Sequence, residues 1–170
     1  ISRVAKSNKV IGITSTLPSE GKSTVASALA QLIAHSGARV LLIDGDLRNP
    51  DISRNLAPNA KQGLIDVVTN KASFEEVIWT DPSTNLDMLP VVAASRLVHT
   101  SEILASDSMK RLFEKLREKY EYIVVDLSPM APPYTARHDV RRGDRSVQER
   151  GAGRHVRPLV RRDHRGPIDE

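Results

Sequence analysis

The sequence lacks cysteine, has few aromatic residues and contains no long apolar run. The absence of cysteine excludes disulfides, thiolate metal sites and cysteine nucleophiles, and it is compatible with a reducing compartment. No apolar run approaches the roughly 20 residues needed to cross a bilayer, and no signal peptide is evident. With 39% hydrophobic and 27% charged residues, the 170 residues are expected to form one globular domain.

Net positive charge is absent from the body of the chain and concentrated at its C-terminal end. Residues 1–136 hold 15 basic and 15 acidic residues, whereas residues 137–170 hold ten arginines, no lysine and six acidic residues. The whole net charge of +4 therefore belongs to the last 34 residues. A neutral body gives no reason to expect a specific nucleic-acid partner.

The segment 137–170 also differs from the body in its apolar content. Only 7 of its 34 residues are hydrophobic, and no run is long enough for a buried strand, which predicts disorder. Two interpretations stay open: a natural basic tail, or a shift of the coding frame near Pro133, because arginine without lysine is typical of GC-rich codons translated out of frame. We therefore expect a partial domain over residues 1–136, preceded by residues before Ile1, and a separate tail over 137–170.

The body alternates short apolar runs with helical patterns, which predicts an α/β fold with a parallel sheet and helices on both faces. A first helix is expected to bury Val25, Ala26, Leu29, Leu32 and Ile33 and to end at Gly37. A second begins at an N-cap at Asp107 or Ser108, and shorter helices are expected at 63–68 and 73–78. The strands are expected at Val10–Thr14, Arg39–Ile43, Leu86–Leu89 and Tyr122–Val125.

A phosphate-binding loop is indicated between the first strand and the first helix, in the sequence TSTLPSEGKST. The consensus has glycine at position 16, where this chain has Thr16, so the match depends on the strand, loop and helix context. Lys22 is expected to contact the β and γ phosphates of ATP, and the Ser23 hydroxyl to bind Mg²⁺. The expected cofactor-binding residues are Ser19, Glu20, Gly21, Lys22, Ser23 and Thr24.

Carboxylates end two further strands, in LLIDGDLRNP and IVVD. Asp44, Asp46 and Asp126 are expected at the carboxyl edge of the sheet, where open α/β sheets bind ligands. Three carboxylates around one Mg²⁺ would suit a hard cation that prefers oxygen ligands. The alternative for each aspartate alone is a turn or helix cap.

The combination of ITSTLPSEGKST, LLIDGDLRNP and IVVDLSP resembles the bacterial tyrosine kinases of exopolysaccharide assembly over residues 8–133. The resemblance implies that Lys22 and Ser23 bind ATP and Mg²⁺, that Asp44 and Asp46 serve magnesium binding and activation of the tyrosine hydroxyl, with Asp44 as the proton acceptor, and that Asp126 completes the metal site. The expected metal ligands are Ser23, Asp46 and Asp126, and the expected catalytic residues are Asp44, Asp46 and Lys22. Ser128 departs from the family pattern, which has proline there.

The same resemblance implies partners and a location. The family works with a membrane-spanning polysaccharide chain-length regulator, in the same polypeptide or as a partner, at the cytoplasmic face of the inner membrane. It assembles in rings that phosphorylate a neighbour's C-terminal tyrosine cluster. This chain has tyrosines only at 120, 122 and 134, and the family continues with further strands after Asp126. We therefore expect weak nucleotide binding, impaired autokinase activity and an exposed sheet edge.

Two other functions stay open at this stage. Septum-positioning and plasmid-partition ATPases share the fold, but they carry an extra lysine five residues before the loop lysine, where this chain has Leu17. A non-catalytic scaffold is the alternative outside enzymes, and ATP binding separates it from both.

Overall fold

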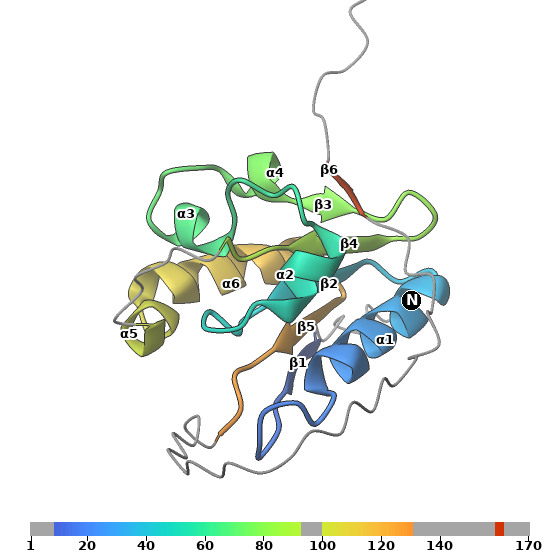
Figure 1. The fold of residues 1–170 in the computed structure, drawn as a ribbon. Coiled ribbons are helices and arrows are strands. Elements are labelled where there is room, and N and C mark those ends of the chain that lie inside the picture. Colours follow the sequence, from blue (N-terminus) through green and yellow to red (C-terminus); the bar gives the residue numbers. More distant parts are fainter. Residues whose placement is uncertain (1–8, 93–99, 131–158, 162–170) are drawn as a thin grey trace, which may run out of the picture.

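The computed structural model describes residues 9–92, 100–130 and 159–161. Within them a six-stranded sheet has the order β1-β5-β2-β4-β3-β6 and carries helices on both faces (Figure 1). The four expected strands are confirmed to within one residue at each end, as β1 (Lys9–Ile13), β2 (Val40–Asp44), β4 (Leu86–Leu89) and β5 (Tyr122–Asp126). All four run parallel.

Two short strands that the sequence pattern did not reveal make the sheet mixed. β3 (Trp79–Thr80) pairs antiparallel with β4, and β6 (Val160–Arg161) pairs antiparallel with β3. A two-residue strand is too short to show an alternating pattern, so only its partners reveal it. On the opposite side, β1 is the last strand of the sheet among the described residues, as expected for an exposed edge.

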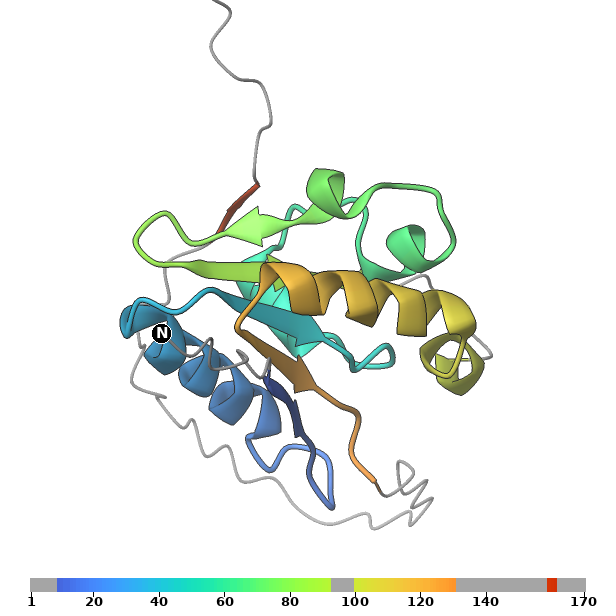
Figure 2. The same cartoon turned by 180° about the vertical axis from the view of Figure 1, so that it is seen from behind.

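The buried strands separate two apolar layers by the alternation of their side chains. Leu41 and Ile43 of β2 face the helices α3 (Leu64–Val68), α4 (Phe74–Val77) and α6 (Asp107–Lys119). Val40 and Leu42 face α1 (Lys22–His35) and α2 (Asp51–Leu56). Figure 2 shows α6 crossing the face opposite to α1, beside the short helix α5 (Thr100–Leu104). At the carboxyl ends of β2 and β5, the apolar side chains give way to the buried carboxylates Asp44 and Asp126.

The buried face of α1 agrees with the prediction only in part, because Ala26 is buried and Ile33 packs against the core as expected, but Val25 and Leu32 do not. Its fully buried residues are Ala26, Ala30 and Ala34, whereas Val25 and Leu32 are 55% and 70% exposed. Alanine lets the helix lie close to the strands, and Val25 and Leu32 then point away from the sheet. The expected end of the helix is confirmed, because Gly37 has φ +92° and donates its N–H to the carbonyl of Ala34.

The second long helix, α6, begins one residue earlier than expected. Its N-cap is Ser106, whose Oγ accepts the N–H of Met109, and neither Asp107 nor Ser108 has this role. Tyr120 follows the helix and is buried, as expected for a packing residue. None of the helices in the described part of the chain is long and apolar enough to span a membrane.

The prediction of disorder for the segment 137–170 does not hold at residues 159–161. Leu159 is buried against the α1 and α2 layer, and its N–H donates to the carbonyl of Leu56. Val160 and Arg161 form β6, and Arg161 donates from Nε to the carbonyl of Glu76. The rest of the segment lies outside the described residues, so the domain boundary at residue 136 stays a prediction.

Candidate functional site at the carboxyl edge of the sheet

The phosphate loop joins β1 to α1 in a conformation that needs left-handed backbone at two positions. Gly21 has φ +83° and is the N-cap of α1, and Ser19 has φ +64°. In the described part of the chain, no side chain caps the first turn of α1. Because the first N–H groups of a helix have no acceptor within the helix, they can donate to an anion that binds in front of it.

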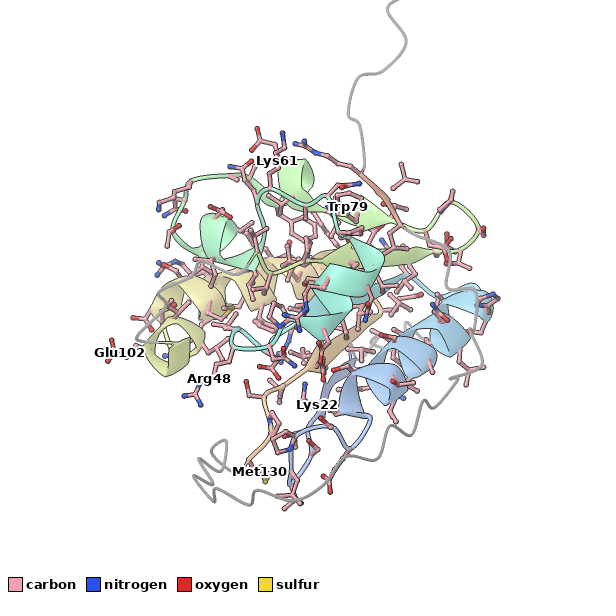
Figure 3. All side chains as sticks on the ribbon, in the orientation of Figure 1. Lys22, Arg48, Lys61, Trp79, Glu102 and Met130 are labelled. Atoms are coloured by element: carbon pink, nitrogen blue, oxygen red, sulfur yellow. The ribbon has the colours of Figure 1, made fainter. Side chains whose placement is uncertain are left out.

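Lys22 is the first residue of α1, and its side chain reaches the end of β5 (Figure 3). Its Nζ is 2.9 Å from Oδ2 of Asp46 and 3.2 Å from both carboxylate oxygens of Asp126. Burial alone would lower the pKa of Lys22, but the hydrogen bonds and charges of the two aspartates outweigh burial and raise it above its ordinary value. The ammonium group is therefore firmly charged and held by two carboxylates.

Asp126 is fully buried at the end of β5, and the Ser23 hydroxyl donates to its Oδ2 at 2.6 Å. Burial raises the pKa of Asp126, and the Ser23 hydrogen bond and the Lys22 charge only partly oppose this. The structure thus brings together the loop lysine, the loop hydroxyl and the carboxylate that the sequence predicts as one site.

Asp46 lies just beyond the end of β2, and it is held by several donors. Its Oδ1 accepts the backbone N–H of Asn49 at 3.1 Å and the hydroxyl of Ser128 at 3.0 Å. Burial would raise the pKa of Asp46, but the hydrogen bond from Lys22 and these two donors hold it below its ordinary value. Ser128, which departs from the family pattern, therefore contacts the site directly.

Asp44 is the last residue of β2 and is fully buried, and among the described residues the Lys22 ammonium bonds to Asp46 and Asp126 and not to Asp44. Its Oδ2 accepts both the backbone N–H of Ser53, at 2.9 Å, and the Ser53 hydroxyl, at 2.7 Å. Burial raises the pKa of Asp44 to about 6, against the lowering effect of these hydrogen bonds, and the charge of Asp126 adds to the increase. The sequence pattern gave no signal for Ser53, because its role depends on the placement of α2.

A cavity of about 650 Å³ opens over the loop and runs between α1 and α2. Lys22, Ser23 and Asp46 line it, whereas Asp44 and Asp126 do not. Arg48, two residues after Asp46, also lines it and is exposed. The rest of the wall includes residues of the loop, of both helices, of the segment between β2 and α2 and of the segment after β5, namely Ser19, Gly21, Thr24, Ser27, Gln31, Asn49, Asp51, Asn55 and Ser128.

The three carboxylates do not by themselves form a metal cluster. Among the described residues, no group of three or more acidic or histidine side chains is arranged to hold a metal ion. The reason is that the Lys22 ammonium lies between Asp46 and Asp126, and that Asp44 faces Ser53. The expectation of three protein carboxylates around one Mg²⁺ is therefore not met. The Ser23 hydroxyl and Asp126 still fit an ion that takes its other ligands from phosphate and water.

Comparison with known proteins gives consistent relatives. Residues 8–137 match the AAA domain family (AAA_31). The chain is 42% identical over 131 residues to the succinoglycan biosynthesis transport protein ExoP of Rhizobium meliloti, and the matched region covers 76% of this chain and 17% of ExoP. It is 34% identical over 127 residues to the tyrosine-protein kinase YwqD of Bacillus subtilis, covering 75% of this chain and 53% of YwqD.

Solved structures agree with these relatives. The kinase domain of the Escherichia coli tyrosine kinase ETK superposes with a TM-score of 0.64 at 30% identity, covering 75% of this chain and 49% of that domain. The septum site-determining protein MinD of Pyrococcus horikoshii, solved with Mg-ADP, gives a TM-score of 0.60 at 25% identity and covers 73% of this chain and 50% of MinD. The chain thus spans about half the length of these two solved proteins.

Proposed function

We propose a function from the premise that this chain belongs to the AAA domain family and, within it, to the bacterial tyrosine kinases of exopolysaccharide biosynthesis. The proposed reaction is transfer of the γ-phosphoryl group of ATP to the hydroxyl of a protein tyrosine. The observation that carries the proposal is the Lys22 ammonium held between Asp46 and Asp126 at the start of a helix whose first turn has no side-chain cap.

The nucleotide phosphates are proposed to lie in the cavity against residues 19–24. There the first-turn N–H groups of α1 and the Lys22 ammonium would donate to the phosphate oxygens. Ser23, Asp46 and Asp126 would hold Mg²⁺, directly or through water, and the ion would neutralise charge on the phosphates. Among the described residues of the cavity wall, Gln31, Asn49 and Asn55 are the amide side chains that could both donate to and accept from an adenine base, so we expect weak binding that depends mainly on the phosphates.

Asp44 is the proposed acceptor of the tyrosine proton. Its pKa of about 6 lies near the range in which a general base is effective, whereas the salt bridge with Lys22 makes Asp46 a weaker base. Asp46 lines the cavity and Asp44 does not, so the assignment requires Asp44 to become accessible when an acceptor enters. Loss of phosphoryl transfer in Asp44→Asn with unchanged ATP affinity would support this role.

The acceptor tyrosine is proposed to come from another polypeptide. Tyr120 is buried, and Tyr122 is half-buried within β5. Tyr134 lies outside the described residues. By family membership, we propose that the parent protein acts with a membrane-spanning polysaccharide chain-length regulator at the cytoplasmic face of the inner membrane and associates in rings.

Phosphoryl transfer in trans tests the proposal. The purified chain is incubated with Mg²⁺ and ATP together with a peptide that carries several tyrosines, and phosphotyrosine is measured by mass spectrometry. We expect slow phosphorylation of the peptide that disappears in Lys22→Ala and persists in Lys115→Ala, an exposed lysine of α6. ATP hydrolysis without phosphotyrosine would instead favour a partition-type or septum-type ATPase, the class suggested by the MinD similarity. No nucleotide binding at all would leave a scaffold.

A further inference from the structure

The phosphate loop contains a carboxylate that is directed at the loop itself. Oε2 of Glu20 accepts the backbone N–H of Thr16 and that of Leu17, both at 3.0 Å. One oxygen atom thereby joins the start of the loop to the residue just before Gly21. A carboxylate in this position repels phosphate, so a direct role in binding the nucleotide is unfavourable.

The loop needs such a contact because its own residues do not favour its shape. Position 16 carries threonine where the phosphate-loop consensus has glycine. Ser19 has φ +64°, a left-handed conformation that costs energy in any residue with a Cβ atom. Thr16, Leu17 and Ser19 are all exposed, so packing against a core does not fix them. Hydrogen bonds within the loop must therefore hold it.

The contacts of Glu20 also decide which N–H groups remain for phosphate. The amides of Thr16 and Leu17 are taken by the carboxylate, whereas the first turn of α1 has no side-chain cap. The loop is thus divided into a part that closes on itself and a part that is open to an anion.

We propose that Glu20 is a positioning residue that holds residues 16–20 in the phosphate-binding shape before the nucleotide arrives. This role rests on the proposed function, since it concerns the same nucleotide site. It replaces the expectation that Glu20 contacts the cofactor. A preformed loop lowers the ordering cost of binding, so loss of the two hydrogen bonds should appear as weaker affinity.

Two substitutions separate this role from an effect of charge. Glu20→Ala removes both hydrogen bonds and the charge, whereas Glu20→Gln removes the charge and keeps one carbonyl oxygen that can accept both N–H groups. With a fluorescent ATP analogue and Mg²⁺, we expect about tenfold weaker binding in Glu20→Ala. Affinity in Glu20→Gln should be equal to or higher than in the unaltered chain. Binding by Glu20→Ala that is as tight as, or tighter than, that of the unaltered chain would overturn the proposal.

Amide hydrogen exchange, measured by NMR without nucleotide, tests the contact independently of binding. Exchange at Thr16 and Leu17 should be slow in the unaltered chain and in Glu20→Gln, and faster in Glu20→Ala. Glu118→Ala, at an exposed glutamate of α6, is the matched control and should leave both amides unchanged. Equal exchange in the unaltered chain and Glu20→Ala overturns the role of Glu20. Failure of the unaltered chain to bind the analogue refutes instead the proposed function, while the exchange result still decides whether Glu20 holds the loop.

Discussion

The ammonium nitrogen of Lys22 lies 2.9 Å from Oδ2 of Asp46, and both side chains are more than nine-tenths buried. A buried ion pair of this kind contributes little net stability, because the cost of removing both charges from water offsets their attraction. The pair is better understood as a prepared site, in which the carboxylates keep the ammonium charged and in place until phosphate oxygens compete for it.

Replacement of Lys22 by alanine should weaken ATP binding by about 10-fold to 150-fold. This range corresponds to one charged hydrogen bond of roughly 1.5–3 kcal/mol. The substitution also leaves Asp46 and Asp126 facing each other without the cation between them, which adds repulsion toward phosphate. Titration calorimetry with Mg-ATP measures the effect, with Lys115→Ala as the control. Unchanged affinity in Lys22→Ala would remove the nucleotide site from this position.

The buried carboxyl of Asp44 should make stability fall as the pH rises from about 4 to about 6. The folded-state pKa of Asp44 is about 6, above an unfolded value of about 3.9. Between these values the folded state binds more protons than the unfolded state, so the free energy of unfolding decreases with pH and stays lower at neutral pH. Asp44→Asn should remove this dependence and raise stability at pH 7, on the order of 1–3 kcal/mol.

Urea denaturation in EDTA at several pH values measures this difference between the unaltered chain and Asp44→Asn. Subtraction of the two profiles isolates Asp44 from the other carboxylates. Asp107→Asn, at an exposed position of α6, controls for the loss of a negative charge. Parallel profiles for the unaltered chain and Asp44→Asn would show that the Asp44 pKa is not raised.

Ser53 should be important for stability although it has no expected role in the sequence pattern. Its hydroxyl donates to Oδ2 of Asp44 at 2.7 Å and accepts the backbone N–H of Val91 at 2.8 Å, and all three residues are buried. Ser53→Ala would leave that N–H without an acceptor and Asp44 with one donor fewer, so we expect a loss of about 1–3 kcal/mol. Urea denaturation measures it, and Ser36→Ala, at an exposed hydroxyl after α1, should change stability much less.

The sequence was sufficient to predict the part of the site that depends on parallel strands. Continuous apolar runs marked β2 and β5 as buried parallel strands. The carboxyl ends of parallel strands lie at the same edge of a sheet, so Asp44 and Asp126 are expected near each other. In the structure they are directly opposite each other in the pairing of β2 with β5. By contrast, the position of Ser53 depends on how α2 packs, and β6 depends on pairing across about 80 residues. Neither leaves a local pattern in the chain.

The face of α1 could be predicted only in part, for a different reason. Periodicity identifies an apolar stripe, but two stripes compete in this helix. The alanines at 26, 30 and 34 permit close approach to the sheet, whereas Val25 and Leu32 are more hydrophobic and yet exposed. The alanine face packs on the sheet because it allows a short distance between helix and sheet, and a hydrophobicity pattern contains no information about that distance.

Gly45 should be required for the close approach of the two motif strands. Its N–H donates to the carbonyl of Asp126 at 2.7 Å, and a Cβ atom built on Gly45 would lie 2.8 Å from that same oxygen. A backbone carbonyl cannot rotate out of the way as the end of a side chain can. The Cβ atom in Gly45→Ala must therefore push the segment after β2 away from the end of β5. We expect a loss of on the order of 1–3 kcal/mol in the free energy of unfolding and weaker Mg-ATP binding, because the Lys22 contacts to Asp46 and Asp126 no longer coincide.

The matched control is Gly12→Ala on β1. Of the described residues, a Cβ atom there would meet Cδ1 of Leu127 alone, at 3.1 Å, and a side-chain methyl can rotate away. Gly12→Ala should therefore lose less stability than Gly45→Ala and keep its nucleotide affinity. Urea denaturation and calorimetry on both variants test the pair. Equal losses in the two variants would mean that the distance between the strand ends does not control the site, and that the Lys22 ammonium adjusts to its carboxylates instead.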